Sequence, residues 1–136
     1  MIKQRQGFTL IEILLVVIII GILVSLAAPR LAGRSEEARK QAANADINGG
    51  IALALDLYEL DNGAYPSKVE DLNSKPSDAA AWKGPYLKKG LPKDPWGNPY
   101  VYRYPGTQNA EGYDLFSIGK DKQEGTDDDI VNWKKA

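Results

Sequence analysis

A long apolar segment near the N-terminus constrains this chain more than any other feature. Residues 10–28 carry a single charged side chain, Glu12, in an otherwise apolar run. That length approaches the ~20 residues that a helix needs to cross the hydrocarbon core of a membrane. Lys3 and Arg5 precede the run, and basic flanks resist translocation. The sequence therefore predicts one membrane-spanning helix, with its N-terminus in the cytoplasm and the rest of the chain on the far side.

A cleaved secretory signal peptide is the alternative interpretation of this segment. Lys3 and Arg5 would form its basic region, and Ser25-Leu26-Ala27 would imitate its small-residue cleavage site. Glu12 argues against it, because an unpaired charge in an apolar helix costs ~2.5–3.5 kcal/mol on membrane-insertion scales. We therefore expect a nearby cation to compensate Glu12.

Cleavage after Gly7 would supply that cation, because it exposes the amine of Phe8 four residues before Glu12. The run GFTLIE at residues 7–12 closely resembles the type IV prepilin signature. In that family a dedicated peptidase cuts after the glycine, methylates the new N-terminal phenylalanine and leaves the helix attached. The resemblance implies this processing at Gly7 and Phe8, and pairing of Glu12 with the Phe8 amine during assembly. Since either charge buried alone is costly, such pairing would set the axial register between neighbouring subunits.

Pro29 ends the apolar run and is the next residue with a structural consequence. Proline removes a backbone donor and clashes with the preceding turn, so we expect a kink or a local opening of the helix there. Filaments of pilin-like proteins contain melted helix near this position. The resemblance makes residues 21–29, from Gly21 to Pro29, the best candidate for that segment.

Length and composition exclude several classes of function. The 136 residues leave room for one domain besides an anchor, because compact domains usually take ~100–150 residues. The chain has no cysteine and no histidine, which removes disulfides, thiol nucleophiles, imidazole bases and the usual zinc ligands. A net charge of -1 gives no general attraction to nucleic acid. We predict no catalytic residues and no nucleic-acid partner.

Residues 30–60 predict a helix that continues outward from the apolar segment, because they are rich in good helix formers. Its apolar residues form three stripes at helical spacing: Ala38, Ala42 and Ala45; Ile47, Ile51 and Leu55; Leu53, Leu57 and Leu60. The second half is therefore apolar over a wide arc, and we expect a sheet to cover it. The run NGG at residues 48–50 should weaken the helix locally. The run DNGAYP at residues 61–66 should end it, with Gly63 in the left-handed conformation.

The C-terminal half predicts a small antiparallel sheet. Residues 101–104, 113–117 and 130–133 have the composition of short strands, whereas residues 67–90 indicate loop with one short helix. The run LPKDPWGNPY at residues 91–100 is a proline-locked turn on physical grounds, and it closely resembles a segment of the major pseudopilins of type II secretion systems. The resemblance implies an α+β, type IV pilin-like fold, in which the long N-terminal helix packs its C-terminal half on the sheet.

An acidic loop precedes the last predicted strand. Residues 115–130 are dense in oxygen donors, which suit Ca²⁺ with its 6–8 oxygen ligands. The loop resembles the calcium loop of major pseudopilins, and this resemblance implies a Ca²⁺ site with these ligands: the carboxylates of Asp121, Asp128 and Asp129, the carbonyls of Ile118 and Gln123, and Ser117. Lys122 replaces the usual glycine of that family. On composition alone, a solvated acidic turn explains the loop as well.

These observations predict a leader at residues 1–7, a membrane and filament-core helix at 8–29, and a periplasmic head at 30–136. The head divides into a helix at 30–60, a loop at 61–99, and the sheet with its acidic loop at 100–136. The resemblance implies a subunit that polymerises into the periplasmic pseudopilus of a type II secretion system and drives the export of folded proteins.

Its implied partners are further copies of itself, minor pseudopilins, the prepilin peptidase, the assembly platform of the bacterial inner membrane, and the lipid bilayer before assembly. Two alternatives stay open. A type IV pilus subunit for adhesion or motility would have the same N-terminus, although its usual C-terminal disulfide loop is absent from this sequence. A membrane-anchored periplasmic binding protein or hydrolase has no motif in its favour.

Overall fold

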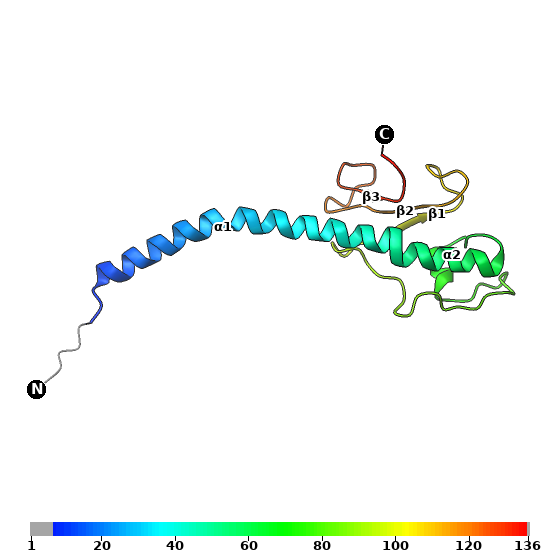
Figure 1. The fold of residues 1–136 in the computed structure, drawn as a ribbon, viewed down its shortest axis with the longest axis horizontal. Helices are drawn as coiled ribbons and strands as arrows, with labels where there is room; N and C mark the ends of the chain where they lie inside the picture. Colours follow the sequence, from blue (N-terminus) through cyan, green and yellow to red (C-terminus); the bar gives the residue numbers. More distant parts are fainter. Residues whose placement is uncertain (1–6, 136) are drawn as a thin grey trace, which may run out of the picture. The chain divides into compact units, whose positions relative to one another are not determined.

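The structure is a computed structural model that describes residues 7–135, apart from the side chains of residues 30 and 31. Its contacts divide the chain into two compact units, one up to Glu37 and one from Ala38 onward. Figure 1 shows the elements in chain order, and each unit is described by itself.

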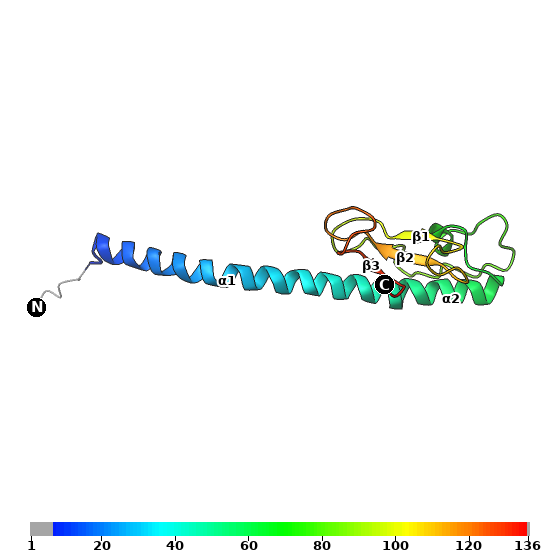
Figure 2. The same cartoon turned by 90° about the horizontal axis from the view of Figure 1, so that it is seen from above.

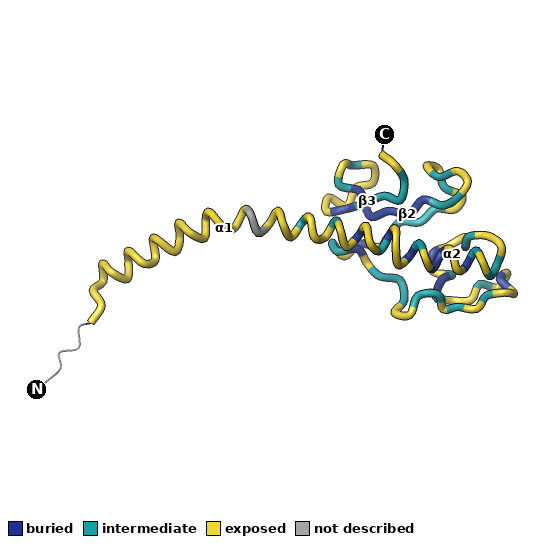
Figure 3. Tube along the Cα trace, viewed as in Figure 1, coloured by how far each residue is buried: buried dark blue, intermediate teal, exposed yellow. Residues whose placement is uncertain are grey.

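The first unit is formed by the N-terminal part of helix α1 (Leu10–Ala45). Its apolar window has a mean hydropathy of 3.1 and none of it is buried within the protein. Figure 3 shows this segment as exposed along its length. A helix that is apolar on every side fits a membrane interior better than water, so α1 has the length and composition of a membrane span.

The local opening that we expected at Pro29 is not present, because α1 is helical through this residue. The lost backbone donor breaks one hydrogen bond of the ladder, to the carbonyl of Ser25, and the turns on either side retain theirs. The conformation of residues 21–29 in a filament stays a prediction.

The second unit begins with the last turns of α1, which lead into a π-helical segment, η1 (Asp46–Gly50), and then into α2 (Ile51–Asn62). The expected weakening at residues 48–50 is thereby confirmed as a single wide turn. The expected stop is also confirmed. Gly63 has φ +83° and its N–H bonds to the carbonyl of Glu59 at 2.7 Å, which is a left-handed helix cap.

Three short strands form an antiparallel sheet in the order β1 (Val101–Arg103), β2 (Asp114–Ser117) and β3 (Ile130–Val131). Tyr102 pairs with Leu115, and Ser117 pairs with Ile130. All three predicted strands are confirmed, each one or two residues shorter than expected. Figures 1 and 2 show the sheet running alongside the helix of this unit.

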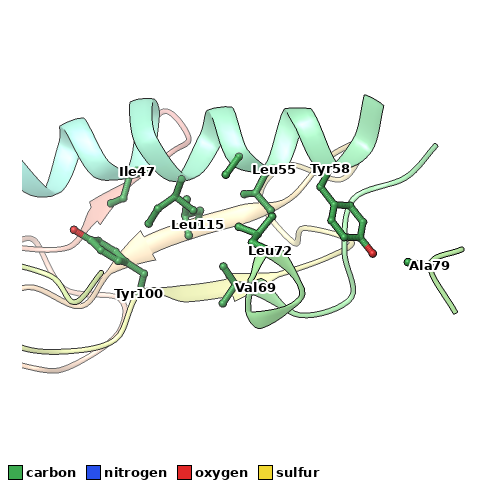
Figure 4. Packing of buried hydrophobic residues seen from close by; sticks show 10 residues of the cluster. Ile47, Leu55, Tyr58, Val69, Leu72, Ala79, Tyr100 and Leu115 are labelled. Atoms are coloured by element: carbon green, nitrogen blue, oxygen red, sulfur yellow. The ribbon is translucent and has the colours of Figure 1, made fainter. Parts of the chain in front are cut away.

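The core lies between the helix and the central strand β2. Ile47, Ile51 and Leu55 are each at most 1% exposed, and they belong to one cluster with Leu115 of β2. Figure 4 shows Val69 and Leu72, from the 3₁₀ turn η2 (Val69–Leu72), closing the same cluster. Burying each such side chain contributes about 1.5–3 kcal/mol, so this stripe anchors the sheet.

The expectation that the sheet covers the whole apolar arc of the helix is wrong. Leu53, Leu57 and Leu60 are 61%, 42% and 80% exposed. We call these three residues the leucine stripe. A sheet of three short strands is too narrow to cover two neighbouring stripes of one helix, and it covers the stripe that contains Ile47 and Leu55.

A buried carboxylate, that of Asp114, organises the turn that connects β1 with β2. Asp114 is 1% exposed and accepts hydrogen bonds from the amides of Thr107, Gln108 and Asn109 at 2.7 to 2.9 Å. Burial pushes the pKa of Asp114 upward, but these bonds and one from the Thr107 hydroxyl outweigh it, so the pKa lies below its ordinary value. The ionised carboxylate therefore holds the turn together.

We predict that Asp114→Asn lowers the free energy of unfolding at neutral pH by about 1–3 kcal/mol, because one oxygen replaces two as an acceptor. A carboxylate with a depressed pKa stabilises above its unfolded-state pKa of about 4, and the stability is lost as pH falls through the folded value. The difference between the two proteins should therefore shrink in acid, which unfolding of the full chain in detergent micelles would measure. Asp127→Asn, at an exposed site, is the control, and an equal loss there would contradict the prediction.

Candidate functional site

The predicted processing site lies at the start of the described chain. Gly7 and Phe8 are both exposed, Phe8 to 82%. The leader residues before Gly7, including Lys3 and Arg5, lie outside the described residues. The cleavage position is thus on an accessible segment that precedes α1.

Glu12 is held by a reciprocal hydrogen-bond pair at the beginning of α1. Its carboxylate accepts from the amide of Thr9 at 2.9 Å and from the Thr9 hydroxyl at 3.2 Å, while the Glu12 amide donates to that hydroxyl at 3.3 Å. This is a capping box, which satisfies helix N–H groups that otherwise have no partner. Neutral donors therefore hold one carboxylate oxygen of Glu12, and no cation pairs with Glu12 among the described residues.

The base of the acidic loop is fixed by Asp94, from the proline-rich turn. Asp94 is 4% exposed, accepts from the amide of Asn98 at 2.7 Å and from the Ser117 hydroxyl at 2.5 Å. Asn98 in turn donates to the carbonyl of Gly119 at 3.1 Å. The turn is structural, as its sequence indicates, and it clamps the point where β2 ends and the acidic loop begins.

The structure brings Asp121, Gln123 and Asp128 together within the loop. The Thr126 hydroxyl donates to a carboxylate oxygen of Asp128 at 2.6 Å, and its oxygen also lies 3.2 Å from the carbonyl oxygen of Gln123. The amide of Asp121 donates to the other oxygen of Asp128 at 3.0 Å, and Asp121 accepts from the Gln123 amide at 2.8 Å. Hydrogen bonds from the Thr126 hydroxyl and these loop amides hold the pKa of Asp128 below its usual range. These oxygens are of the type that Ca²⁺ prefers.

Asp129 is placed differently from the other two aspartates. It is 7% exposed, one carboxylate oxygen accepts from the Gly125 amide at 2.7 Å, and the other is buried without a hydrogen-bond partner. Ser117 is buried too, and Ile118 is half-buried. Among residues 7–135, no three acidic side chains lie close enough together to hold a metal ion by themselves. A Ca²⁺ site here would therefore depend on carbonyl oxygens as well, and it stays a prediction.

Three residues of the loop, Gly119, Lys122 and Gly125, have left-handed backbone. Gly119 has φ +62°, and a Cβ there would lie 2.6 Å from atoms of Asp128, so only glycine fits. Lys122 has φ +60° and is the only non-glycine residue with positive φ among the described residues. The backbone thus explains why glycine is usual at this position in the family that the loop resembles.

Sequence reasoning missed the contributions of Asp114 and Thr126. Asp114 lies among large apolar residues of a predicted strand. A charged residue in such a position was the available signal, because aspartate is rarely buried unless it has partners. Thr126 had no comparable signal, because its role depends on the folded path of the loop.

A GFTLIE run at the start of an exposed apolar helix is the combination that defines proteins of the prepilin class. Residues 2–28 match the model of the prokaryotic N-terminal methylation motif. Residues 30–133 match the family described as type II secretion system protein G. The chain belongs to this family.

Curated relatives extend over nearly the whole chain. It is 49% identical to the type II secretion system core protein G of Pseudomonas aeruginosa, with 96% of each chain covered. It is also 49% identical to that of Escherichia coli K12, covering 96% of this chain and 92% of the relative. The protein of the same name from Vibrio cholerae is 44% identical, with 96% and 93% covered.

A solved structure agrees with the fold. The crystal structure of the major pseudopilin from the type 2 secretion system of enterohaemorrhagic Escherichia coli aligns with a TM-score of 0.66 and 34% identity, covering 76% of this chain and 89% of that one. The predicted pilin-like α+β fold is confirmed. The chain is a structural subunit of the pseudopilus in type II secretion, as the first of our three interpretations predicted.

We predict that Lys122→Gly stabilises the head, because a left-handed conformation costs a residue with a Cβ roughly 1–2 kcal/mol. Part of the gain is offset by the greater freedom of glycine in the unfolded chain, so we expect a net rise of about 0.5–1 kcal/mol in the free energy of unfolding. The measurement is unfolding of the full chain in detergent micelles without added metal.

Lys120→Gly is the matched control, since it removes the same charge two residues away at a position without positive φ. It should leave stability unchanged or lower it. Equal stabilisation by both variants would assign the effect to charge and reject the backbone explanation.

Proposed function

We propose that this chain is made as a precursor, inserted once through the bacterial inner membrane, and cleaved after Gly7 by the prepilin peptidase, with methylation of Phe8. The head then lies in the periplasm. The observation that carries this proposal is the exposed apolar part of α1 directly after the accessible Gly7-Phe8 bond. The match to the N-terminal methylation motif supports it. The basic residues of the leader favour a cytoplasmic N-terminus.

In assembly, Glu12 pairs with the N-terminal amine of Phe8 of a neighbouring subunit. The capping box supports this role, because it holds the carboxylate at the first turn of the helix by neutral donors only. A cation is the stronger partner for a carboxylate in an apolar medium. The negative charge of Glu12 is then neutralised only in the filament, by the Phe8 amine of a neighbouring subunit. This requirement favours one axial register between the two subunits.

The head offers a second surface for assembly, the leucine stripe. Three exposed leucines on one helix face form an apolar patch, and such patches mark interaction sites. A further copy of the chain is the partner that every subunit of a pseudopilus has. We assign the stripe to contacts between copies in the filament. Minor pseudopilins and the inner-membrane assembly platform are the remaining partners.

The acidic loop binds Ca²⁺ through Asp121, Asp128 and Asp129, with carbonyl oxygens of Ile118 and Gln123 and with Ser117 nearby. Support comes from the gathered oxygens around Thr126 and from the buried, unpartnered oxygen of Asp129. Bound Ca²⁺ would neutralise the carboxylates and join the loop to the end of β2. The ion has a structural role, and no enzymatic activity is proposed for the chain.

We predict that Glu12→Gln and Glu12→Ala both reduce filament yield at least about tenfold, since an unpaired charge in the apolar core costs ~2.5–3.5 kcal/mol. Glutamine keeps an acceptor for the capping box but loses the charge. Filaments sheared from cells and quantified against the membrane-inserted pool measure the effect. Normal assembly of Glu12→Gln would contradict charge pairing and leave capping as the sole role of Glu12.

We predict that Ca²⁺, and not Mg²⁺, raises the unfolding temperature of the full chain in detergent micelles. Binding to the folded state alone stabilises by about 2.7 kcal/mol when the ion is at 100 times its dissociation constant. Asp128→Ala should abolish the shift, whereas Asp127→Ala, at the neighbouring exposed position, should retain it. An unchanged unfolding temperature of the unmodified chain with Ca²⁺ would reject the site and leave the prepilin assignment intact.

A further inference from the structure

One cavity in the head has a lining that the proposed roles of Glu12, the leucine stripe and the acidic loop do not explain. It has a volume of about 410 Å³ and lies between the end of α2, the turn after it, and the segment after η2. Its walls contain three tyrosines, two aspartates and one asparagine: Tyr58, Tyr65, Tyr104, Asp71, Asp78 and Asn62. We call it the tyrosine pocket. Its volume is in the range of sites for small molecules or single side chains.

The aromatic wall of the pocket is buried on one side and accessible on the other. Tyr58 is 5% exposed and belongs to the core cluster, and Figure 4 shows its hydroxyl pointing toward Ala79, a lining residue. Tyr65 and Tyr104 contact each other edge to face, with ring centroids 5.7 Å apart, and Tyr104 is 37% exposed. The faces of such rings attract cations.

Two aspartates, Asp71 and Asp78, give the pocket a negative charge. Asp78 is exposed and has no hydrogen bond or ion pair within residues 7–135. The carboxylate of Asp71 accepts only long hydrogen bonds, from the Lys68 amide at 3.3 Å and the Ser67 hydroxyl at 3.4 Å. The side-chain amide nitrogen of Asn62 donates to the Tyr58 carbonyl, whereas the side-chain oxygen of Asn62 is buried without a hydrogen-bond partner. Among the described residues, no lysine or arginine lines the pocket.

The pKa of Tyr58 agrees with two carboxylates lying beside the pocket. Burial raises the pKa of the Tyr58 hydroxyl, and the charges of Asp71 and Asp78 raise it further. Both carboxylates therefore act on the same small volume. The pocket therefore combines aromatic faces with two carboxylates and an unpartnered amide oxygen. It lacks a cationic side chain among the described residues that could neutralise the carboxylates.

We propose that the tyrosine pocket binds an organic cation, the side chain of a lysine or arginine presented by a protein partner. The long apolar stem of such a side chain would lie against the tyrosine rings, and its charged end would reach Asp78 and Asp71. This assignment does not depend on processing at Gly7, on the leucine stripe or on Ca²⁺. It gives the head a binding site for a basic segment of another protein.

The test is a titration of isotopically labelled full chain in detergent micelles, followed by the backbone amide signals of Ala64, Ala80 and Ala81, which line the pocket. The probes are acetyl-arginine amide, acetyl-lysine amide, the neutral acetyl-norleucine amide, and free spermidine. We expect saturable shifts with the arginine and lysine probes and none with norleucine. Shifts of equal size with norleucine, or no shifts with any probe, would overturn the proposal.

Two variants test the two parts of the site. Asp78→Asn removes the exposed charge and Tyr104→Leu removes the accessible ring, and each should weaken binding of the arginine probe about threefold or more. Glu111→Gln, at an exposed carboxylate outside the pocket, should leave it unchanged. Unchanged affinity in both pocket variants, or binding of spermidine alone, would overturn the assignment to a protein side chain.

Discussion

The burial of one helix stripe under the strand β2 is the interaction on which the head depends. Ile47, Ile51 and Leu55 meet Leu115 in a single cluster, and no other apolar layer of comparable size exists among the described residues. The sheet has strands of two to four residues, so its width matches one stripe of the helix. The leucine stripe remains outside as a direct consequence. The same narrow sheet that completes the core thus leaves an apolar helix face exposed, and this is the face that we propose for contacts between copies.

The sequence of the helix changes along its length, from apolar on every side to apolar mainly on the side that faces the sheet. The apolar part of α1 has no buried side chain and no polar face, whereas α2 alternates buried and exposed residues. Figure 3 makes the change visible along the tube. The π turn η1 lies where the buried stripe begins. A wide turn rotates the residues that follow it relative to those before it, and so it helps to set which side of α2 faces β2.

Local signals explain how much of the fold could be predicted from the sequence. Apolar periodicity predicted the helix, residues typical of strands predicted the three strands, and Gly63 predicted the helix end, because each signal depends on neighbouring residues. The exposure of Leu53 and Leu57 could not be predicted this way. Periodicity identifies apolar faces, but the width of the sheet decides which face is covered. The bond from Ser117 to Asp94 joins residues 23 positions apart, and the acceptor role of Asp114 depends on a turn whose path no short motif specifies.

Most of the head outside the helix is irregular, so many of its backbone N–H groups need hydrogen-bond partners outside helices and strands. Buried N–H groups that are left without acceptors cost free energy, and three short strands satisfy few of them. Aspartates supply the missing acceptors: Asp94 binds the amides of Trp96 and Asn98, Asp114 those of residues 107–109, and Asp128 those of Lys120 and Asp121. A chain without cysteine thus holds its loops by aspartate carboxylates. The acidic loop is one member of this set, and a cation placed there would reinforce an arrangement of backbone and carboxylate that the chain already forms by itself.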